Sequence, residues 1–248
     1  MSSNALQKAL EVLEAFQKSP DSLSVKDVAA LNHETQSSVQ RSIYTLETLG
    51  YLEREEAGKR YVPGRACLRP VYGYLRNNRF LETATPYLID LSERFATRAD
   101  LTVLDGTEIV YLSRIPSRDE LLNLSPLGRR WPAIQTASGR AILAAMDDEE
   151  REKVIACSKI RQITPRSLTT KEQIYTAINK TREVGYAYQS EEVLIGAASV
   201  GAAVVGSNGK VQGAIIVGGP TETFNDPDKR HALGNAVKQA AQAIGAYV

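Results

Sequence analysis

The sequence predicts an α+β protein in which a small helical N-terminal part precedes a larger part of mixed strands and helices. In residues 1–63, apolar side chains recur at three- and four-residue steps, which is the period of amphipathic helices. From residue 98 onward, short strand-like runs alternate with helical segments. Two pairs of these runs are joined by Asp-Gly and Asn-Gly turns. Such turns favour antiparallel hairpins over a doubly wound parallel sheet.

Length and composition indicate an ordinary globular protein. The 248 residues suffice for one large or two modest domains, and 43 % hydrophobic with 24 % charged residues is usual for a soluble chain. No apolar run reaches the roughly 18 residues of a membrane span, and the first residues lack a signal peptide's basic region. Two distant cysteines, Cys67 and Cys157, predict no disulfide framework. We therefore expect a cytoplasmic protein without membrane contact.

Three helices are expected at the N-terminus. The first covers residues 4–18, and the second begins at Ser24, with Asp27 placed three residues on to complete a capping box. The third covers residues 36–49 and ends at Gly50, which favours a left-handed cap. Its inner side carries an apolar stripe that should pack on the first two helices: Val39, Ile43, Leu46 and Leu49.

A hairpin and a helical linker are expected next. Residues 51–55 and 59–63 are strand-like around a turn at Gly58, so residues 1–63 have the pattern of a winged helix-turn-helix. A linker over residues 64–97 then contains one helix within 65–78 and another within 85–96, with Pro86 in the first turn of the latter.

The third helix has an unusual polar start that suits base recognition. Short Ser and Gln side chains permit close approach to a major groove, where Gln pairs with adenine and Arg with guanine. The DNA-contacting set expected from the helix and the wing is Gln36, Ser37, Ser38, Gln40, Arg41, Lys59 and Arg60. Residues 54–79 also carry a basic excess of five, which alone is more typical of a solvated face. A helix that merely packs a small domain is the alternative interpretation.

The C-terminal part, residues 98–248, alternates strands and helices. The expected strands are residues 101–105, 108–115, 121–125, 186–189, 199–205 and 210–219. The expected helices are residues 138–146, 148–157, 171–185 and 227–247.

Several of these motifs together resemble the IclR family of bacterial transcription regulators. They include "SVKDVAALNHETQSSVQRSIYTLETLGYLERE" near the N-terminus and "PLGRRWPAIQTASGRAILA", "REVGYAYQSEEVLIGAASVGAAVV" and "GKVQGAIIVGGP" later, in the family's order. The resemblance covers nearly the whole chain. It implies a winged-helix DNA reader, a helical linker and a GAF-like effector domain. It also implies that homodimers or dimers of dimers bind a pseudo-palindromic operator in double-stranded DNA.

The loop before residue 138 is the expected effector site. A helix N-terminus there offers main-chain N–H groups to a carboxylate, although from this stretch alone Ser138 is at least as well explained as a helix cap. The resemblance implies a pocket for a small organic acid, with an aromatic carboxylate as one candidate. Carried over by motif, its residues are Leu122, Leu124, Thr136, Ala137, Ser138, Gln189, Ser199, Ile216 and Gly218.

Other residues of this part are better explained by packing than by binding. Tyr111 and Arg114 favour surface or packing roles, and the single Trp131 favours a packing role. Glu191 and Glu192 are adjacent in an expected extended segment, so they should face opposite ways and share no site.

An enzyme is the main competing class, and the sequence argues against it. The two histidines, His33 and His231, belong to no metal cluster, and no G-x-S-x-G surrounds Ser138. We expect no catalytic residue, metal or cofactor. The prediction is a ligand-responsive transcription regulator, with repression of a catabolic operon as the commoner family mode. Activation, or a sensor acting only through protein partners, is the alternative.

Overall fold

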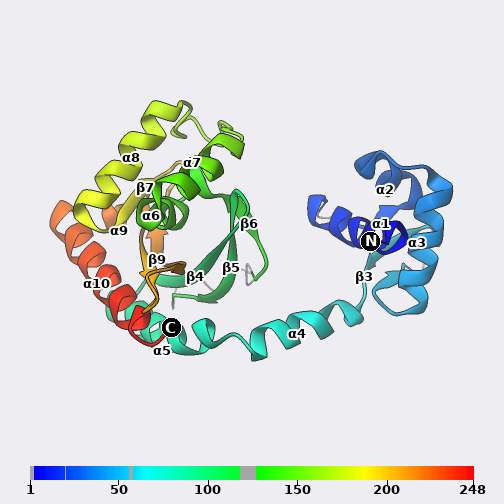
Figure 1. The fold of residues 1–248 in the computed structure, drawn as a ribbon, viewed down its shortest axis with the longest axis horizontal. Helices are drawn as coiled ribbons and strands as arrows, with labels where there is room; N and C mark the ends of the chain where they lie inside the picture. Colours follow the sequence, from blue (N-terminus) through cyan, green and yellow to red (C-terminus); the bar gives the residue numbers. More distant parts are fainter. Residues whose placement is uncertain (1–2, 20, 56–57, 118–126) are drawn as a thin grey trace. The chain divides into compact units, whose positions relative to one another are not determined.

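A computed structural model describes residues 3–19, 21–55, 58–117 and 127–248 of the protein. The contacts divide the chain once, into a unit Met1–Asn77 and a unit Asn78–Val248. Figure 1 follows the chain through both units. The functional boundaries expected at residues 63 and 97 stay predictions.

The first unit is a three-helix core with a small antiparallel sheet. Its Ser24–Asp27 capping box is confirmed, since the Asp27 amide donates to Ser24 Oγ over 3.2 Å and the Ser24 amide to Asp27 Oδ2 over 2.9 Å. The two-residue strand β1, which the sequence did not predict, adds an edge to the hairpin and gives the order β1-β3-β2. The elements are α1 (Asn4–Ala15), β1 (Leu23–Ser24), α2 (Val25–Asn32), α3 (Gln36–Thr48), β2 (Leu52–Arg54) and β3 (Arg60–Pro63).

Two residues with a left-handed backbone conformation lie on either side of α3. His33 has φ 54° at the end of α2, and Gly50 has φ 75° just beyond α3, where a residue without Cβ is favoured. Val39, Ile43 and Leu46 are buried as predicted. The fourth residue of that stripe is a correction, because Leu49 is 55 % exposed.

Leu49 is exposed because it borders an open groove between α1 and α3. Leu6 and Leu10 of α1 line the same groove and are themselves exposed. The apolar residues of α1 therefore divide between two faces, and only Val12, Ala15 and the following Phe16 are buried in the core.

The linker segment forms two helices of different character. α4 (Leu68–Arg76) follows a short 3₁₀ turn and has no buried residue. α5 (Arg79–Phe95) begins earlier than predicted, because the Asn78 side chain accepts from the Leu81 amide and caps it. Pro86 therefore lies inside the helix rather than in its first turn, which corrects the expectation. α5 buries Phe80, Leu88 and Leu91 in the second unit.

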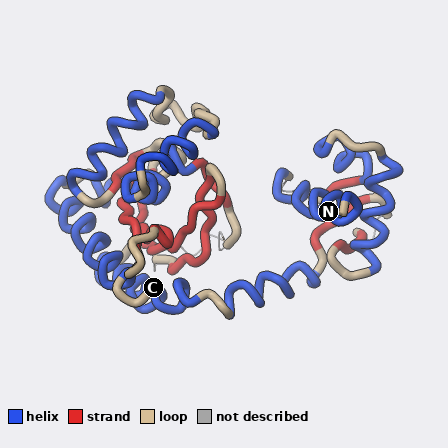
Figure 2. Tube along the Cα trace, viewed as in Figure 1, coloured by secondary structure: helices blue, strands red, loops and turns tan. Residues whose placement is uncertain are grey.

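A six-stranded antiparallel sheet forms the centre of the second unit (Figure 2). Its order is β6-β5-β4-β9-β8-β7, which confirms the α+β class. The Asp105-Gly106 and Asn208-Gly209 hairpins are confirmed, with Gly106 at φ 62° and Gly209 at φ 75°. The strands are β4 (Arg98–Asp105), β5 (Glu108–Ile115), β6 (Arg130–Pro132), β7 (Ala187–Ser190), β8 (Ala197–Val205) and β9 (Val211–Pro220).

One observed strand, β6, was not predicted, because three residues are too few to show a period of two. The strand expected at residues 121–125 lies outside the described residues.

Alternating residues give the sheet two apolar faces. Ile215 and Val217 of β9 pack with α5 and α10 (Pro227–Gly245), whereas Ala214 packs with α6 (Ala137–Ala145) on the other face. The remaining helices are α7 (Asp148–Cys157), α8 (Lys171–Val184) and the short α9 (Thr221–Phe224). None of the helices in the described ranges combines the length and apolarity needed to cross a membrane.

Candidate functional site

The N-terminus of α6 is capped by Thr136 and not by Ser138. Thr136 Oγ1 accepts from the Gly139 amide over 3.1 Å, so the capping explanation of Ser138 is wrong. The amides of Ala137 and Ser138 find no acceptor within the described residues. These two N–H groups, at the positive end of the helix dipole, are free to bind an anion.

Ser138 itself carries a buried polar group without a partner. The residue is fully buried, and among the described residues its Oγ makes no hydrogen bond. Such an orphaned hydroxyl costs about 1–3 kcal/mol and therefore calls for an explanation. Ser138 lines a cavity of about 150 Å³ on the α6 face of the sheet.

The cavity brings together most of the effector residues predicted from the motifs. Gly218 does not line it: a Cβ at that position would lie 2.8 Å from the guanidinium of Arg98, so this glycine makes room for an arginine. Leu122 and Leu124 lie outside the described residues. The predicted residues that do line the cavity are Thr136, Ala137, Ser138, Gln189, Ser199 and Ile216.

A charged wall of the cavity was missed by the sequence analysis. Asp100 on β4 lies opposite Arg114 of β5 in the sheet register, and Arg114 Nε donates to Asp100 Oδ1 over 2.8 Å. Arg98 Nε lies 3.4 Å from the other carboxylate oxygen. The predicted strand began at residue 101, three residues late. Its missing start contains the alternation Arg98, Ala99, Asp100 that would have indicated a polar face.

Burial controls the ionisation of this wall. Burial raises the pKa of the Asp100 carboxyl, and the hydrogen bonds and charges of Arg114 and Arg98 act against that rise. Burial and the Asp100 charge raise the pKa of Tyr111, whereas Arg98, Arg114 and Arg129 lower it. The guanidinium carbon of Arg114 lies 5.6 Å from the centroid of the Tyr111 ring.

Tyr111, Arg114 and Trp131 line the cavity, although the sequence favoured surface or packing roles for them. Arg129 lies over the Trp131 ring, with its guanidinium carbon 4.7 Å from the ring centroid. Trp131 also packs against the apolar cluster of α6 and α8, so it has both a packing contact and a cavity contact.

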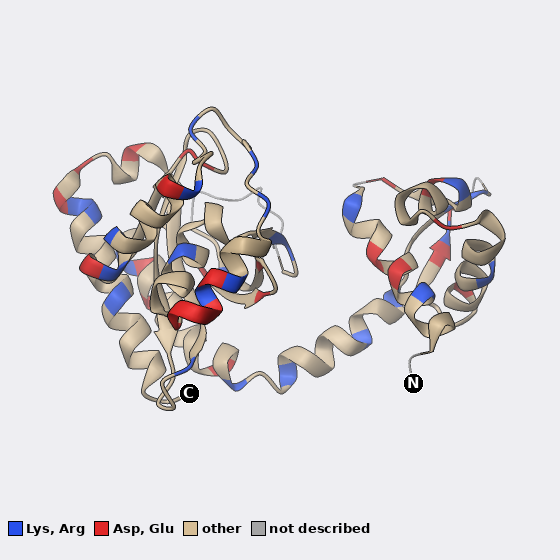
Figure 3. Ribbon diagram, turned by 45° about the horizontal axis from the view of Figure 1, so that its top comes forward, with Lys and Arg blue, Asp and Glu red and all other residues tan. Residues whose placement is uncertain are grey.

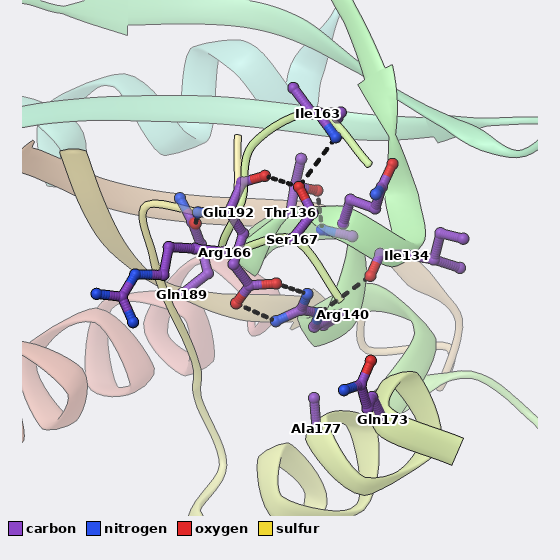
Figure 4. A network of polar contacts seen from close by, with 12 residues as sticks. Ile134, Thr136, Arg140, Ile163, Arg166, Ser167, Gln173, Ala177, Gln189 and Glu192 are labelled. Carbon is purple, nitrogen blue, oxygen red and sulfur yellow. Dashed lines mark hydrogen bonds and ion pairs between the residues drawn. The ribbon is translucent and has the colours of Figure 1, made fainter. Parts of the chain in front are cut away.

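The segment between β7 and β8 is latched to α6 (Figure 4). Arg140 is almost fully buried, donates from Nε to the Ile134 carbonyl over 3.0 Å, and forms a two-pronged pair with Glu192. Gln189 accepts from the Glu192 amide over 3.1 Å and donates to Ser199 Oγ over 3.2 Å. Two cavity-lining residues thus take their positions from this latch.

The Glu191–Glu192 segment is not extended, which corrects the prediction. Glu191 has φ 59°, and its side chain accepts from the Gly196 amide, whereas Glu192 turns to Arg140. Thr164 and Ser167 hold the two main-chain carbonyls by hydrogen bonds of 2.6 and 2.7 Å. The two carboxylates share no site, as expected, but because a turn separates them.

In the first unit, α3 presents the predicted polar residues. Gln36, Ser37, Gln40 and Arg41 are exposed, whereas Ser38 is half-buried, with its Oγ 3.4 Å from Lys8 Nζ. The helix begins at a Thr35 cap that the sequence analysis did not identify.

The two basic wing residues differ in their contacts. Arg60 Nε donates to Ser22 Oγ over 3.0 Å, and its guanidinium pairs with Asp27 at 3.3 Å. Lys59 is exposed and forms no ion pair within the described residues. Tyr44, which was not predicted as a site residue, is 68 % exposed one turn beyond Gln40. The charged residues of α4 are all arginines, and the helix accordingly shows blue and no red in Figure 3.

Comparisons with known proteins agree on one family. Residues 72–246 match the profile of the bacterial transcriptional regulator IclR C-terminal domain, and residues 5–56 match the IclR helix-turn-helix domain. The chain is 26 % identical to the HTH-type transcriptional regulator XynR of Escherichia coli, covering 96 % of this chain and 93 % of that protein. It is 27 % identical to the Pca regulon regulatory protein of Pseudomonas putida, covering 86 % and 73 % respectively.

Solved structures give the same answer. IclR of Thermotoga maritima is 28 % identical and superposes with a TM-score of 0.73 over 98 % of this chain and 97 % of that one. An IclR homologue of Microbacterium hydrocarbonoxydans, crystallised with 4-hydroxybenzoate, shares the fold with a TM-score of 0.78 at 22 % identity, covering 98 % of each chain. The family consists of transcriptional regulators and not of enzymes. With a helix-turn-helix unit followed by a matched C-terminal domain, the chain belongs to the IclR family of bacterial transcriptional regulators.

Proposed function

We propose that this regulator binds a small organic acid in the cavity at the α6 N-terminus and changes its affinity for DNA as a result. The observation that carries the proposal is the buried Ser138 hydroxyl without a partner. Together with the amides of Ala137 and Ser138, it offers three donors to a carboxylate. Six of the motif-predicted effector residues line this cavity, which supports the same location.

An aromatic carboxylate is the favoured effector. The side chains of Tyr111, Trp131 and Ile216 supply flat or apolar walls to the cavity. The homologue crystallised with 4-hydroxybenzoate has the same fold, which is consistent with an aromatic acid here.

The DNA-binding proposal rests on α3 and the wing. Gln36, Ser37, Gln40 and Arg41 are exposed on one helix, and short polar side chains there suit a major groove. Ser38 and Lys59 complete the proposed contact set, whereas Arg60, which was predicted from the sequence to join it, is bound to Ser22 and Asp27 and is proposed to support the wing. We assign the protein the role of a repressor of a catabolic operon, in line with related repressors such as AllR of Escherichia coli.

A second copy of the chain is the proposed cover for the apolar surface of the first unit. Leu6, Leu10 and Leu49 are 61 %, 51 % and 55 % exposed along one groove. α4 adds an exposed stripe at helical spacing, comprising Leu68, Val71 and Tyr72. Two-fold pairing would give two readers for the half-sites of a pseudo-palindrome. Leu10→Lys should shift the sedimentation coefficient toward the monomer, and an unchanged value would remove this face from the dimer.

The effector site is tested by filling the cavity. Benzoate and 4-hydroxybenzoate should raise the Tm of the full chain, and Ser138→Trp should abolish both shifts while the variant stays folded. A matched serine outside the cavity, Ser158, donates to the Val154 carbonyl over 2.7 Å, and Ser158→Ala should keep both shifts. A full response in Ser138→Trp would place the acid elsewhere.

The reader is tested by Arg41→Ala on a duplex selected from a random library with the full chain. If Arg41 reads a base, the variant should lose about 1–3 kcal/mol of binding free energy at that site. Unchanged affinity would remove Arg41 from the reading set. Failure to select any duplex would favour a sensor that acts through protein partners.

A further inference from the structure

The arginines of the effector cavity are not equally neutralised. Asp100 is buried, and both of its oxygens already accept from arginines, Oδ1 from Arg114 and Oδ2 from Arg98 and Arg114. Asp100 therefore has no free carboxylate oxygen to offer to a further arginine. Arg129 lines the same cavity, is exposed, and pairs with no carboxylate among the described residues.

Arg129 is nevertheless held in place. Its guanidinium stacks over Trp131 at 4.7 Å, and its main-chain carbonyl accepts from the Tyr111 amide over 3.0 Å. Stacking on an indole restricts a flexible side chain while leaving the N–H groups of the guanidinium edge available. These donors form a planar fork that matches a carboxylate.

The neighbouring arginine shows what a purely structural role looks like here. Arg130 Nε donates to Glu108 over 2.8 Å, and its terminal nitrogen pairs with Asp105 over 2.8 Å. Arg129 lies just before β6 and lines the cavity, whereas Arg130, the first residue of β6, does not. One of these adjacent arginines is therefore neutralised by carboxylates, and the other has no carboxylate partner among the described residues.

Two anion-binding groups line the same cavity. Ser138 and its helix amides form one of them and Arg129 the other, and Ile216, Val193 and Leu194 are among the apolar lining residues. A monocarboxylate would engage the helix N-terminus and leave Arg129 without a counter-charge. A molecule with two anionic groups would engage both.

From this arrangement we propose that the effector is a dianion, specifically a dicarboxylate. One carboxylate binds the α6 N-terminus and Ser138, and the other binds Arg129 over Trp131. This inference rests on the proposed function and specifies its ligand class. Arg129 then determines the preference for diacids, and the α6 N-terminus provides the binding common to all acids.

The test compares matched acids by calorimetry on the full chain. The probes are benzoate against terephthalate and isophthalate, and hexanoate against adipate. At least one diacid should bind ten times or more tightly than its monoacid. Arg129→Gln should reduce that ratio to within about threefold while monoacid affinity stays within threefold, and Arg129→Lys should keep part of the preference. Arg130→Gln is the control, and its diacid preference should equal that of the unaltered protein.

The outcomes distinguish a failure of the dianion inference from a failure of the proposed acid site. Monoacids that bind as tightly as every diacid would overturn the dianion while leaving the acid site standing. An Arg129→Gln variant that keeps the full diacid preference would also overturn it. If none of the five acids binds, or if Ser138→Trp leaves their binding intact, the proposed acid site fails as well.

Discussion

At the scale of single residues, Ser138→Ala should leave stability equal or higher and should weaken acid binding. Ser138→Ala removes a buried hydroxyl without a partner, so the free energy of unfolding of the ligand-free protein should stay equal or rise, by at most about 1–3 kcal/mol. The same change removes a hydrogen bond to a charged ligand, worth about 1.5–3 kcal/mol, and should weaken acid binding about tenfold or more. Denaturant unfolding and calorimetry measure the two effects.

Ser92 is the matched control for this experiment. It is a buried helical serine whose Oγ donates to the Pro116 carbonyl over 3.3 Å. Ser92→Ala should therefore lower the free energy of unfolding by about 0.5–1.5 kcal/mol and leave acid affinity unchanged. A Ser138→Ala variant that behaves like Ser92→Ala would assign Ser138 to packing alone.

The wing provides a second contrast between neighbours. Lys59 is exposed without an ion pair in the described part of the chain, so Lys59→Ala should weaken DNA binding and reduce the salt slope by about 1. Arg60 is tied to Ser22 and Asp27, so Arg60→Ala should mainly lower the free energy of unfolding, by about 0.2–1 kcal/mol.

Binding isotherms at several salt concentrations, combined with denaturant unfolding, distinguish these two roles. An Arg60→Ala variant that loses salt slope without losing stability would move this arginine to the DNA contacts. An unchanged salt slope in Lys59→Ala would take the lysine out of them.

At the scale of elements, the buried Arg140–Glu192 pair joins α6 to the segment after β7. Removing one partner of a buried ion pair leaves an uncompensated charge and costs about 3–5 kcal/mol. Arg140→Met should therefore strongly destabilise the protein, and the double variant Arg140→Met, Glu192→Leu should recover most of that loss. Thermal and denaturant unfolding measure both variants.

Acid binding in the double variant tests whether the latch also positions the cavity. The main-chain amide of Glu192 donates to the side chain of Gln189, a cavity-lining residue. Because the ion pair with Arg140 holds that main chain in place, replacing the pair should weaken acid binding even in a variant whose stability has returned. Full affinity in a stable double variant would limit the pair to a structural role.

The elements also show where prediction from sequence succeeds and where it ends. The capping box at Ser24, the left-handed Gly50 and the Asp-Gly and Asn-Gly hairpins depend on residues close in sequence, and all were predicted. The Asn78 cap was not anticipated, so Pro86 was misplaced.

The predictions for the cavity divide along the same line. Residues of the loop before α6 are local and motif-bearing, and they were predicted. Arg98 and Asp100 alternate on one strand, but Arg114 and Arg129 join them in one cavity only through the pairing of β4 with β5 and of β5 with the segment around β6. No local pattern contains that register, so the charged wall became visible only in the fold.

At the scale of the whole molecule, the two units have separate cores and are joined by a helix that buries none of its residues. We propose α4, which leads from the first core toward the second unit, as a route for the signal from the acid. Whatever the route, linkage makes the effect reciprocal. If the acid lowers DNA affinity by some factor, typically 5- to 150-fold, bound DNA must lower acid affinity by the same factor.

This reciprocity can be measured together with its route. Calorimetry with and without the selected duplex gives the factor for the acid, and DNA titrations with and without the acid give it for the DNA. Tyr74 is an exposed residue within α4. Tyr74→Pro removes a helical hydrogen bond and should break the helix at a cost of about 3 kcal/mol. Because α4 also carries part of the proposed dimer surface, sedimentation first checks that Tyr74→Pro keeps the dimer. Neither binding site contains Tyr74, so both single affinities should then persist while the coupling factor falls toward one.

Tyr74→Ala keeps the backbone hydrogen bond and should retain the coupling. Equal coupling in the two variants would exclude an intact α4 as the route. An acid that binds without changing DNA affinity in the unaltered protein would contradict a DNA-coupled sensor altogether, since a ligand shifts an equilibrium only by its difference in affinity for the two states.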